Sequence, residues 1–376
     1  MPRRLSRPTC VALLLTALLG SLVGCSSPPA RPGAGAPSAS QAPSASGPSG
    51  APAPTPPPLR DVRTSYPSAA ASFAPLWAAY EYGLFEQHGL RPSEPVMISG
   101  GPANAQTLSA RELEASYTAF SPMVGAIMGG APIKVVMSFG RGFSFALFTR
   151  VGSGVASAQD MKGKRAGVSR IGSESYTVIR NWARANGLRD DDIGYVNAGT
   201  VAERLVAMEA GAIDLMPLDP PVVVVAEKRG FVLVADLTRE PLPWQRESLT
   251  LPEEIIRNDS ALATAITRAI AEAAYLIRAD RQRFDAVVGK YIRQDDPDAL
   301  GAAYRAALNG WIPRGRPDPA DVHAVQESVD EEIPGTASQP FTRFVDLSVL
   351  DRLEQEGFFE RLERQYPLPP GALPAR

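Results

Sequence analysis

Short apolar segments alternate with amphipathic segments through much of the chain, and glycine follows several of the amphipathic ones. The apolar segments have the length of strands, and the amphipathic ones have the spacing of helices. Helices that end at glycine and connect strands indicate right-handed crossovers and a parallel sheet. In the middle of the chain this pattern predicts strands at 164–168, 193–197, 212–216 and 231–236, and helices at 175–185, 201–210 and 222–229.

A region with the same alternation precedes this one, and a helical region follows. Residues 260–291 carry apolar side chains at helical spacing, with Asp280 placed to interrupt them. Two α/β units in series followed by helices predict an α/β fold built on parallel sheets. The preceding unit has predicted strands at 61–66, 95–99, 114–118 and 132–139, and predicted helices at 74–82, 102–110 and 122–129.

The N-terminus has the features of an export signal. Three arginines precede an apolar run at 10–24, which is shorter than the roughly 20 residues that span a bilayer. The run ends in Leu-Val-Gly-Cys, which resembles the bacterial lipobox. We therefore expect a lipoprotein signal peptide at 1–25 and lipidation, as with palmitate, of Cys25. The alternative is an ordinary signal peptide that contains a cysteine.

Residues 26–58 have the composition of a tether. Proline, alanine, serine and glycine supply 30 of these 33 residues, and no large apolar side chain occurs among them. Nothing in this stretch offsets the entropy cost of ordering the backbone. We expect a disordered stalk between a lipid anchor and a folded domain.

Composition and motifs exclude several classes of function. The chain has 38 Lys and Arg against 40 Asp and Glu, so nucleic acid is not an expected partner. Two histidines and two cysteines are too few for a typical zinc or iron–sulfur site, so we expect no metal and no cofactor. The chain has no P-loop, no His-Glu-x-x-His and no Gly-x-Ser-x-Gly motif, and we therefore do not expect an enzyme.

A series of short motifs carries a family resemblance. The segment 73–90 (FAPLWAAYEYGLFEQHGL) resembles the opening helix of ABC-transporter substrate-binding proteins of the nitrate, sulfonate, taurine and thiamine-pyrimidine-precursor group. Further similar motifs follow in order over residues 60–300. The sequence departs from the group at 112–115, where Glu-Leu-Glu-Ala stands in place of Gly-x-x-Asp. The further motifs are Gly100-Gly101, Ser121-Pro122, 129–134 (GGAPIK), 160–164 (DMKGK), 210–214 (AGAID) and 252–256 (PEEII).

The resemblance implies a two-lobed clamshell of the periplasmic binding protein type II kind, each lobe a mostly parallel sheet flanked by helices. Lobe one would comprise 59–148 and 241–376, and lobe two 149–240. The implied function is capture of a small solute between the lobes and its delivery to an ABC permease. The implied location is extracytoplasmic, with a lipid anchor to the cell membrane, and we expect a monomer.

Candidate ligand-binding residues follow from the rule that such sheets bind ligands beyond the carboxyl ends of their strands. Arg170 is suited to an anionic head group, whereas Glu174 or Asp219 would accept hydrogen bonds from an amine or aminopyrimidine. The predicted residues are Ser72, Phe73, Gly100, Gly101, Asn104, Phe120 and Ser121 in lobe one, and Arg170, Gly172, Ser173, Tyr176 and Asp219 in lobe two.

Two other functions remain open from the sequence. One is an anchored enzyme of pyrimidine-precursor chemistry on the same fold, which would turn its ligand over. The other is a scaffold lipoprotein whose clamshell binds no small molecule.

Overall fold

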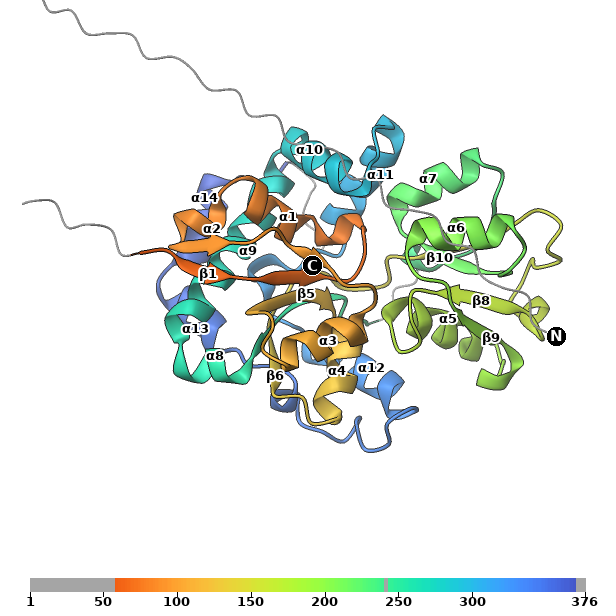
Figure 1. Ribbon diagram of the computed structural model, residues 1–376, viewed down its shortest axis with the longest axis horizontal. Helices are drawn as coiled ribbons and strands as arrows, with labels where there is room; N and C mark the ends of the chain where they lie inside the picture. The colour runs from red at the N-terminus through yellow and green to blue at the C-terminus, as the bar shows by residue number, and fades with distance from the viewer. Residues whose placement is uncertain (1–57, 240–242, 370–376) are drawn as a thin grey trace, which may run out of the picture. The chain divides into compact units, whose positions relative to one another are not determined.

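The computed structural model describes residues 58–239 and 243–369. The expected signal peptide, Cys25 and all but the last residue of the expected tether lie outside the described residues. The described chain alternates strands and helices in two groups and continues into a series of helices (Figure 1). This arrangement confirms the predicted α/β class.

Lobe one is built on a five-stranded sheet of order β4-β2-β5-β12-β6. Only β12 is antiparallel to its neighbours, so the sheet is mostly parallel, as predicted. Every residue of β5 and β12 is buried, because helices cover both faces of the sheet. The strands are β2 (Thr64–Tyr66), β4 (Val96–Met97), β5 (Ala115–Ala119), β6 (Ile133–Ser138) and β12 (Glu247–Pro252), and β1 (Arg60–Val62) pairs separately with β3 (Leu90–Pro92).

Two layers of helices enclose this sheet, each with its own apolar core. Helices α3 (Gly101–Ser109), α4 (Phe120–Met128) and α12 (Pro319–Asp330) form one layer. The other layer contains α1 (Ala74–Glu81), α2 (Leu84–Gln87), α8 (Glu253–Asn258), α9 (Ser260–Ala279), α10 (Arg281–Ile292), α11 (Pro297–Leu308), α13 (Ser348–Gln355) and α14 (Phe358–Gln365).

Helix α9 is the central helix of the larger layer. Among the described residues it alone is long and apolar enough to cross a membrane, yet 78% of its apolar window is buried inside the protein. We therefore assign it to the core of lobe one. The predicted interruption at Asp280 is confirmed, since the Asp280 carboxylate accepts a hydrogen bond of 3.0 Å from the Arg283 backbone N–H and begins α10.

Lobe two repeats the arrangement with one antiparallel strand. β7 lies between β10 and β11 and is antiparallel to both, while β8 and β9 are parallel. A parallel bridge between Ala166 and Leu215 joins the two groups of strands. The elements are β7 (Ala146–Thr149), β8 (Arg165–Val168), β9 (Gly194–Asn197), β10 (Met216–Leu218) and β11 (Val232–Asp236), with helices α5 (Glu174–Ala185), α6 (Val201–Glu209) and α7 (Pro220–Lys228).

The chain passes between the lobes twice, and the two passages run side by side. One leads from β6 to β7 and the other from β11 to β12, and Arg141 of the first forms an antiparallel bridge with Gln245 of the second. The chain packs closely at Gly140, where a Cβ would lie 2.6 Å from the ends of the Arg246 and Glu247 side chains. These passages are where a hinge between the lobes would lie.

Two predicted strands differ from the structure. The strand expected at 61–66 is divided at Arg63. The backbone N–H of Arg63 donates to the Glu114 carboxylate at 2.7 Å and therefore makes no hydrogen bond to a neighbouring strand. The strand expected at 212–216 begins only at Met216. The residues before it form a turn, in which Asp214 accepts a hydrogen bond of 2.9 Å from the Arg165 backbone N–H.

Candidate functional site

Two small cavities lie between the lobes and share Ser72 and Asp219 in their walls. Their volumes are about 30 and 40 Å³, room for a few water molecules, so the lobes lie close together. The first cavity is bordered by α1, by α9 and by the two passages between the lobes, which we call the hinge. The second is bordered by the loops that follow β2, β4 and β8. Together we call them the cleft.

Lobe one contributes polar backbone at the start of helices. Ser72 precedes α1, and Gly100 precedes α3. Gly100 has a φ of +82°, which favours glycine, and a Cβ there would lie 3.0 Å from Arg170 Cβ of lobe two. A Cβ on Gly101 would lie 2.2 Å from Pro122, so α3 and α4 approach each other at this glycine.

Lobe two contributes the N-termini of two helices. Ser173 precedes α5, and its hydroxyl lies 2.8 Å from that of Ser175, which in turn accepts a hydrogen bond of 3.0 Å from the Ser169 N–H. Asp219 precedes α7 at the position of an N-cap, yet its side chain makes no capping hydrogen bond. The carboxyl group of Asp219 therefore stands at the cleft without the partner that this position usually supplies.

The hinge contributes a buried ion pair. Arg246 Nε donates to Glu247 Oε2 at 2.7 Å, and both side chains are almost completely buried. Two further guanidinium groups line the cleft, Arg204 from α6 and Arg278 from α9. Arg204 donates to the Gly199 carbonyl at 2.8 Å, while its Nε has no partner among the described residues. Arg278, in contrast, donates to the carbonyls of Ala307 and Ala274, at 3.0 Å each.

Burial shifts the pKa values of the charged groups in the cleft. It raises the pKa of Asp219 to about 7 and that of Glu174 to about 8, because a carboxylate loses hydration there. It lowers the pKa of Arg204 and of Arg278 to about 10 for the same reason. The two carboxyl groups thus exchange protons close to neutral pH. Such shifts are frequent where proteins bind ligands.

Half of the predicted site residues line the cleft together. These are Ser72, Phe73, Gly100, Gly101, Ser173 and Asp219. The ring of Phe73 also packs against Tyr66 and Tyr117, at centroid distances of 6.5 and 5.8 Å, so one residue serves both the core and the cleft wall.

The remaining predicted residues lie elsewhere, each for a visible reason. Asn104 is buried and donates to the carbonyls of Ile98 and Gly100 at 2.6 and 2.9 Å, which fixes the turn beside the cleft. Phe120 is buried in the core between α3, α4 and α12. Tyr176 stacks edge-on against Tyr195 in lobe two.

Three more predicted residues lie outside the cleft, and of these Ser121 is buried. Ser121 and Gly172 line a separate groove between α3, α4 and α5. Arg170 is exposed, and its stem and Nε pass beside Gly100.

Several residues that line the cleft were not predicted. Arg246, Glu247, Arg278 and Tyr117 border the first cavity, and Arg204 borders the second. One signal was present for Arg278, a charged residue inside the apolar face of a long helix. Another was the pair Arg246-Glu247 at the start of the buried strand β12. The prediction considered only residues that follow the carboxyl ends of strands, and it therefore missed residues at the start of a strand or within a helix.

The chain was compared with known proteins at the level of sequence families, curated proteins and solved structures. The profile of the NMT1/THI5-like family matches residues 70–283. The search of the curated proteins gave no match.

Solved structures with the same fold cover most of the chain. A protein of Bordetella bronchiseptica RB50 is 20% identical with a TM-score of 0.70, over 82% of this chain and 98% of that one. The alkanesulfonate-binding protein SsuA of Xanthomonas axonopodis pv. citri, bound to MOPS, is 18% identical with a TM-score of 0.64, over 78% and 98%. The periplasmic nitrate-binding protein NrtA of Synechocystis PCC 6803 is 13% identical with a TM-score of 0.58, over 84% and 91%.

Proposed function

The chain belongs to the NMT1/THI5-like family, and we propose that it is an extracytoplasmic receptor that captures a small solute between its lobes for an ABC importer. The observation that carries this proposal is the composition of the cleft. Three carboxyl and three guanidinium groups from both lobes and the hinge converge on two small cavities. Burying that many charges is costly, and a ligand that pairs with them would recover part of the cost.

The charges of the cleft support a solute of mixed polarity. Its carboxyl groups (Glu174, Asp219 and Glu247) equal its guanidinium groups (Arg204, Arg246 and Arg278) in number. Near neutral pH Asp219 and Glu174 are largely protonated, so the three guanidinium groups outnumber the charged carboxylates and can hold an anionic group, while the two carboxyl groups still accept hydrogen bonds from the solute. We therefore propose a solute with hydrogen-bond donors as well as acceptors, such as an aminosulfonate or an aminopyrimidine.

The likeness to solved receptors supports the same class of function. The structures of similar fold include a protein named for alkanesulfonate binding and one named for nitrate binding. We propose lipidation at Cys25 and a flexible stalk at 26–58 on the basis of the sequence. Such an anchor would raise the concentration of the receptor near its permease while leaving it free to rotate.

A thermal-shift screen tests this proposal. The full-length protein is heated with taurine, alkanesulfonates, nitrate and aminopyrimidines, each in large excess. A bound solute at about 100 times its Kd stabilises the folded state by about 2.7 kcal/mol, so we expect a rise in Tm of about 3–6 °C for one chemical class.

Matched variants show whether the response comes from the cleft. Arg204→Gln and Asp219→Asn should abolish the shift in Tm, whereas Arg189→Gln and Asp191→Asn, which alter an exposed ion pair of lobe two, should keep it. A panel in which no compound shifts Tm would contradict the receptor proposal. Conversion of a bound compound to a product would favour the anchored enzyme instead.

A further inference from the structure

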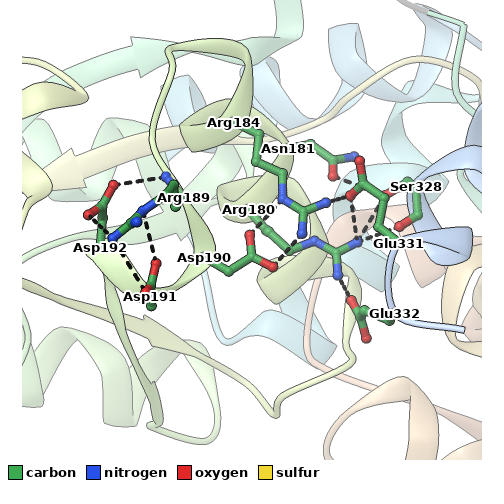
Figure 2. A network of polar contacts seen from close by, with 10 residues as sticks. All are labelled: Arg180, Asn181, Arg184, Arg189, Asp190, Asp191, Asp192, Ser328, Glu331 and Glu332. Carbon is green, nitrogen blue, oxygen red and sulfur yellow. Dashed lines mark hydrogen bonds and ion pairs between the residues drawn. The ribbon is translucent and has the colours of Figure 1, made fainter.

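Helix α5 of lobe two lies against the end of helix α12 of lobe one, and a network of charged side chains joins them (Figure 2). The two helices belong to separate cores. Val178 and Ile179 of α5 pack into lobe two, whereas Val325 and Val329 of α12 pack into lobe one. The contacts between α5 and the end of α12 therefore connect the lobes and do not stabilise either one alone.

Arg180 is at the centre of this network. Its side chain is completely buried, and its Nη2 donates to the Ser328 carbonyl at 2.6 Å. Its Nη1 is paired with Glu332, and its Nη2 lies 3.8 Å from the Glu331 carboxylate. A guanidinium with this geometry holds a carbonyl and two carboxylates at once, which a single ammonium does not reproduce.

Neighbouring side chains extend the contact along α5. Arg184, one turn beyond Arg180, is paired with Glu331 of lobe one and also with Asp190 of its own lobe. The Ser328 hydroxyl donates to Asn181 Oδ1 at 2.9 Å. Figure 2 shows these groups pointing toward one another from α5 on one side and from the end of α12 on the other.

The same helix carries part of the cleft at its other end. Glu174 and Ser175 begin α5 and line the second cavity, less than two turns before Arg180. Because a helix transmits its orientation over such a short distance, the contacts of Arg180 determine where these two residues lie. Any movement of lobe two that opens the cleft at the start of α5 has to change the contacts between α5 and α12.

We propose that Arg180 is a positioning residue that latches α5 to α12 and so favours the arrangement in which the lobes are closed over the cleft. The inference deepens the proposed function, since the cleft that Arg180 organises is the proposed solute site. It goes beyond that function in one respect, because the latch acts without solute and sets how much of the free receptor is closed.

The distance between the lobes measures the latch directly. The described residues contain no cysteine, so Glu112→Cys in lobe one and Lys162→Cys in lobe two accept spin labels in a full-length chain with Cys10 and Cys25 replaced by serine. Pulsed electron paramagnetic resonance then gives the distribution of distances without any solute. We expect Arg180→Gln to raise the ratio of open to closed molecules roughly tenfold, the effect of losing a hydrogen-bonded ion pair.

Further variants separate positioning from a general loss of stability. Glu332→Gln should open the lobes as Arg180→Gln does, and the two changes together should add little, because each removes the same pair. Arg180→Lys should restore part of the closed population. Asp190→Asn is the matched control, since it removes a partner of Arg184 inside lobe two and leaves the contact between lobes in place.

The outcomes are clear without a known ligand. If Arg180→Gln and Glu332→Gln leave the distance distribution of the wild type unchanged, the latch does not exist. If Arg180→Gln does not fold, the exposed pair of changes Glu331→Gln and Glu332→Gln provides the same test. A thermal-shift screen without a hit would overturn the proposed function and leave the measured latch unaffected.

Discussion

Two helices of lobe two, α5 and α7, contact lobe one. They carry charged residues in the same order, but the side chains that contact lobe one differ in burial. Each begins at the cleft with an acidic residue, Glu174 in α5 and Asp219 before α7. Each carries a cation farther along that pairs with lobe one. In α5 this cation is Arg180, which is completely buried. In α7 it is Lys228, whose side chain is 55% exposed and is paired with Asp296 beside α11.

The difference indicates unequal roles for the two contacts. An exposed ion pair contributes little, because water screens it and the side chains lose entropy on pairing. A buried guanidinium with several acceptors is lost only at high cost, because its partners and its own charge are left unsatisfied. We infer that the buried ion pairs of α5 contribute more to the closed arrangement than the exposed Lys228–Asp296 pair does, while α7 itself packs along α11.

The largest expected effect concerns the acidic ends of the two helices. Folding raises the pKa of Asp219 from 3.8 to about 7 and that of Glu174 from 4.5 to about 8. From about pH 4 to pH 8 the folded protein therefore keeps protons that the unfolded chain releases. Its free energy of unfolding should fall with rising pH, by up to about 1.4 kcal/mol per pH unit for each group.

Urea denaturation at pH 5 to 9 measures this slope. Asp219→Asn and Glu174→Gln should each flatten the curve and should be more stable than the wild type at pH 8. Asp191→Asn, in an exposed ion pair, should keep the wild-type slope. If the curves of both cleft variants run parallel to the wild-type curve, the raised pKa values of Asp219 and Glu174 are contradicted.

The next effect separates the two contacts between the lobes. Arg180→Ala removes a buried cation and its stem, and Glu331 and Glu332 are exposed enough to regain hydration. We therefore expect a loss of about 2–3 kcal/mol in the free energy of unfolding, below the usual cost of breaking a buried pair. Chemical denaturation at pH 7 measures it. A loss no greater than that for Lys228→Ala would remove the distinction between the contacts.

A smaller effect is expected on the affinity for a positively charged solute, which depends on the protonation of Asp219 and Glu174. A solute with an ammonium group requires charged carboxylates in the cleft, and these form as the pH rises through 7 and 8. Its affinity should increase between pH 6 and pH 8, by at most about tenfold per pH unit for each coupled proton. Calorimetric titration at several pH values measures this, and an affinity that falls over the same range would contradict a cationic contact with Asp219 or Glu174.

The smallest effect is expected at the exposed contact. Lys228→Ala should leave the midpoint of denaturation unchanged and should shift the distance distribution between the lobes less than Arg180→Gln does. A shift equal to that of Arg180→Gln would mean that α7 contributes to the latch as strongly as α5.

The sequence predicts the lobes better than it predicts the cleft between them. Alternating periodicity and glycine after each helix locate β8, α5, β9, α6 and α7 closely, because those signals are local, whereas β10 begins only at Met216. Ser72, Ser173 and Asp219 were found because they lie in loops that connect the end of a strand to the start of a helix. Arg246 and Arg278 were not, because only the return of the chain through the hinge and the packing of α9 bring them to the cleft.

The same limit applies to the contact between the lobes. In the sequence, Arg180 occupies an ordinary polar position of an amphipathic helix, and its partners follow about 150 residues later. Nothing in the local pattern marks it as buried. Long-range packing also explains Phe120, which follows a strand as the rule requires but turns into the core between α3, α4 and α12.

Calorimetric titration with the compound that raises Tm most shows whether the cleft holds one solute between the lobes. We expect one molecule bound per chain, with binding lost in the double variant Arg204→Gln and Asp219→Asn and retained in the double variant Arg189→Gln and Asp191→Asn. Equal affinity in the two double variants would mean that the solute binds outside the cleft.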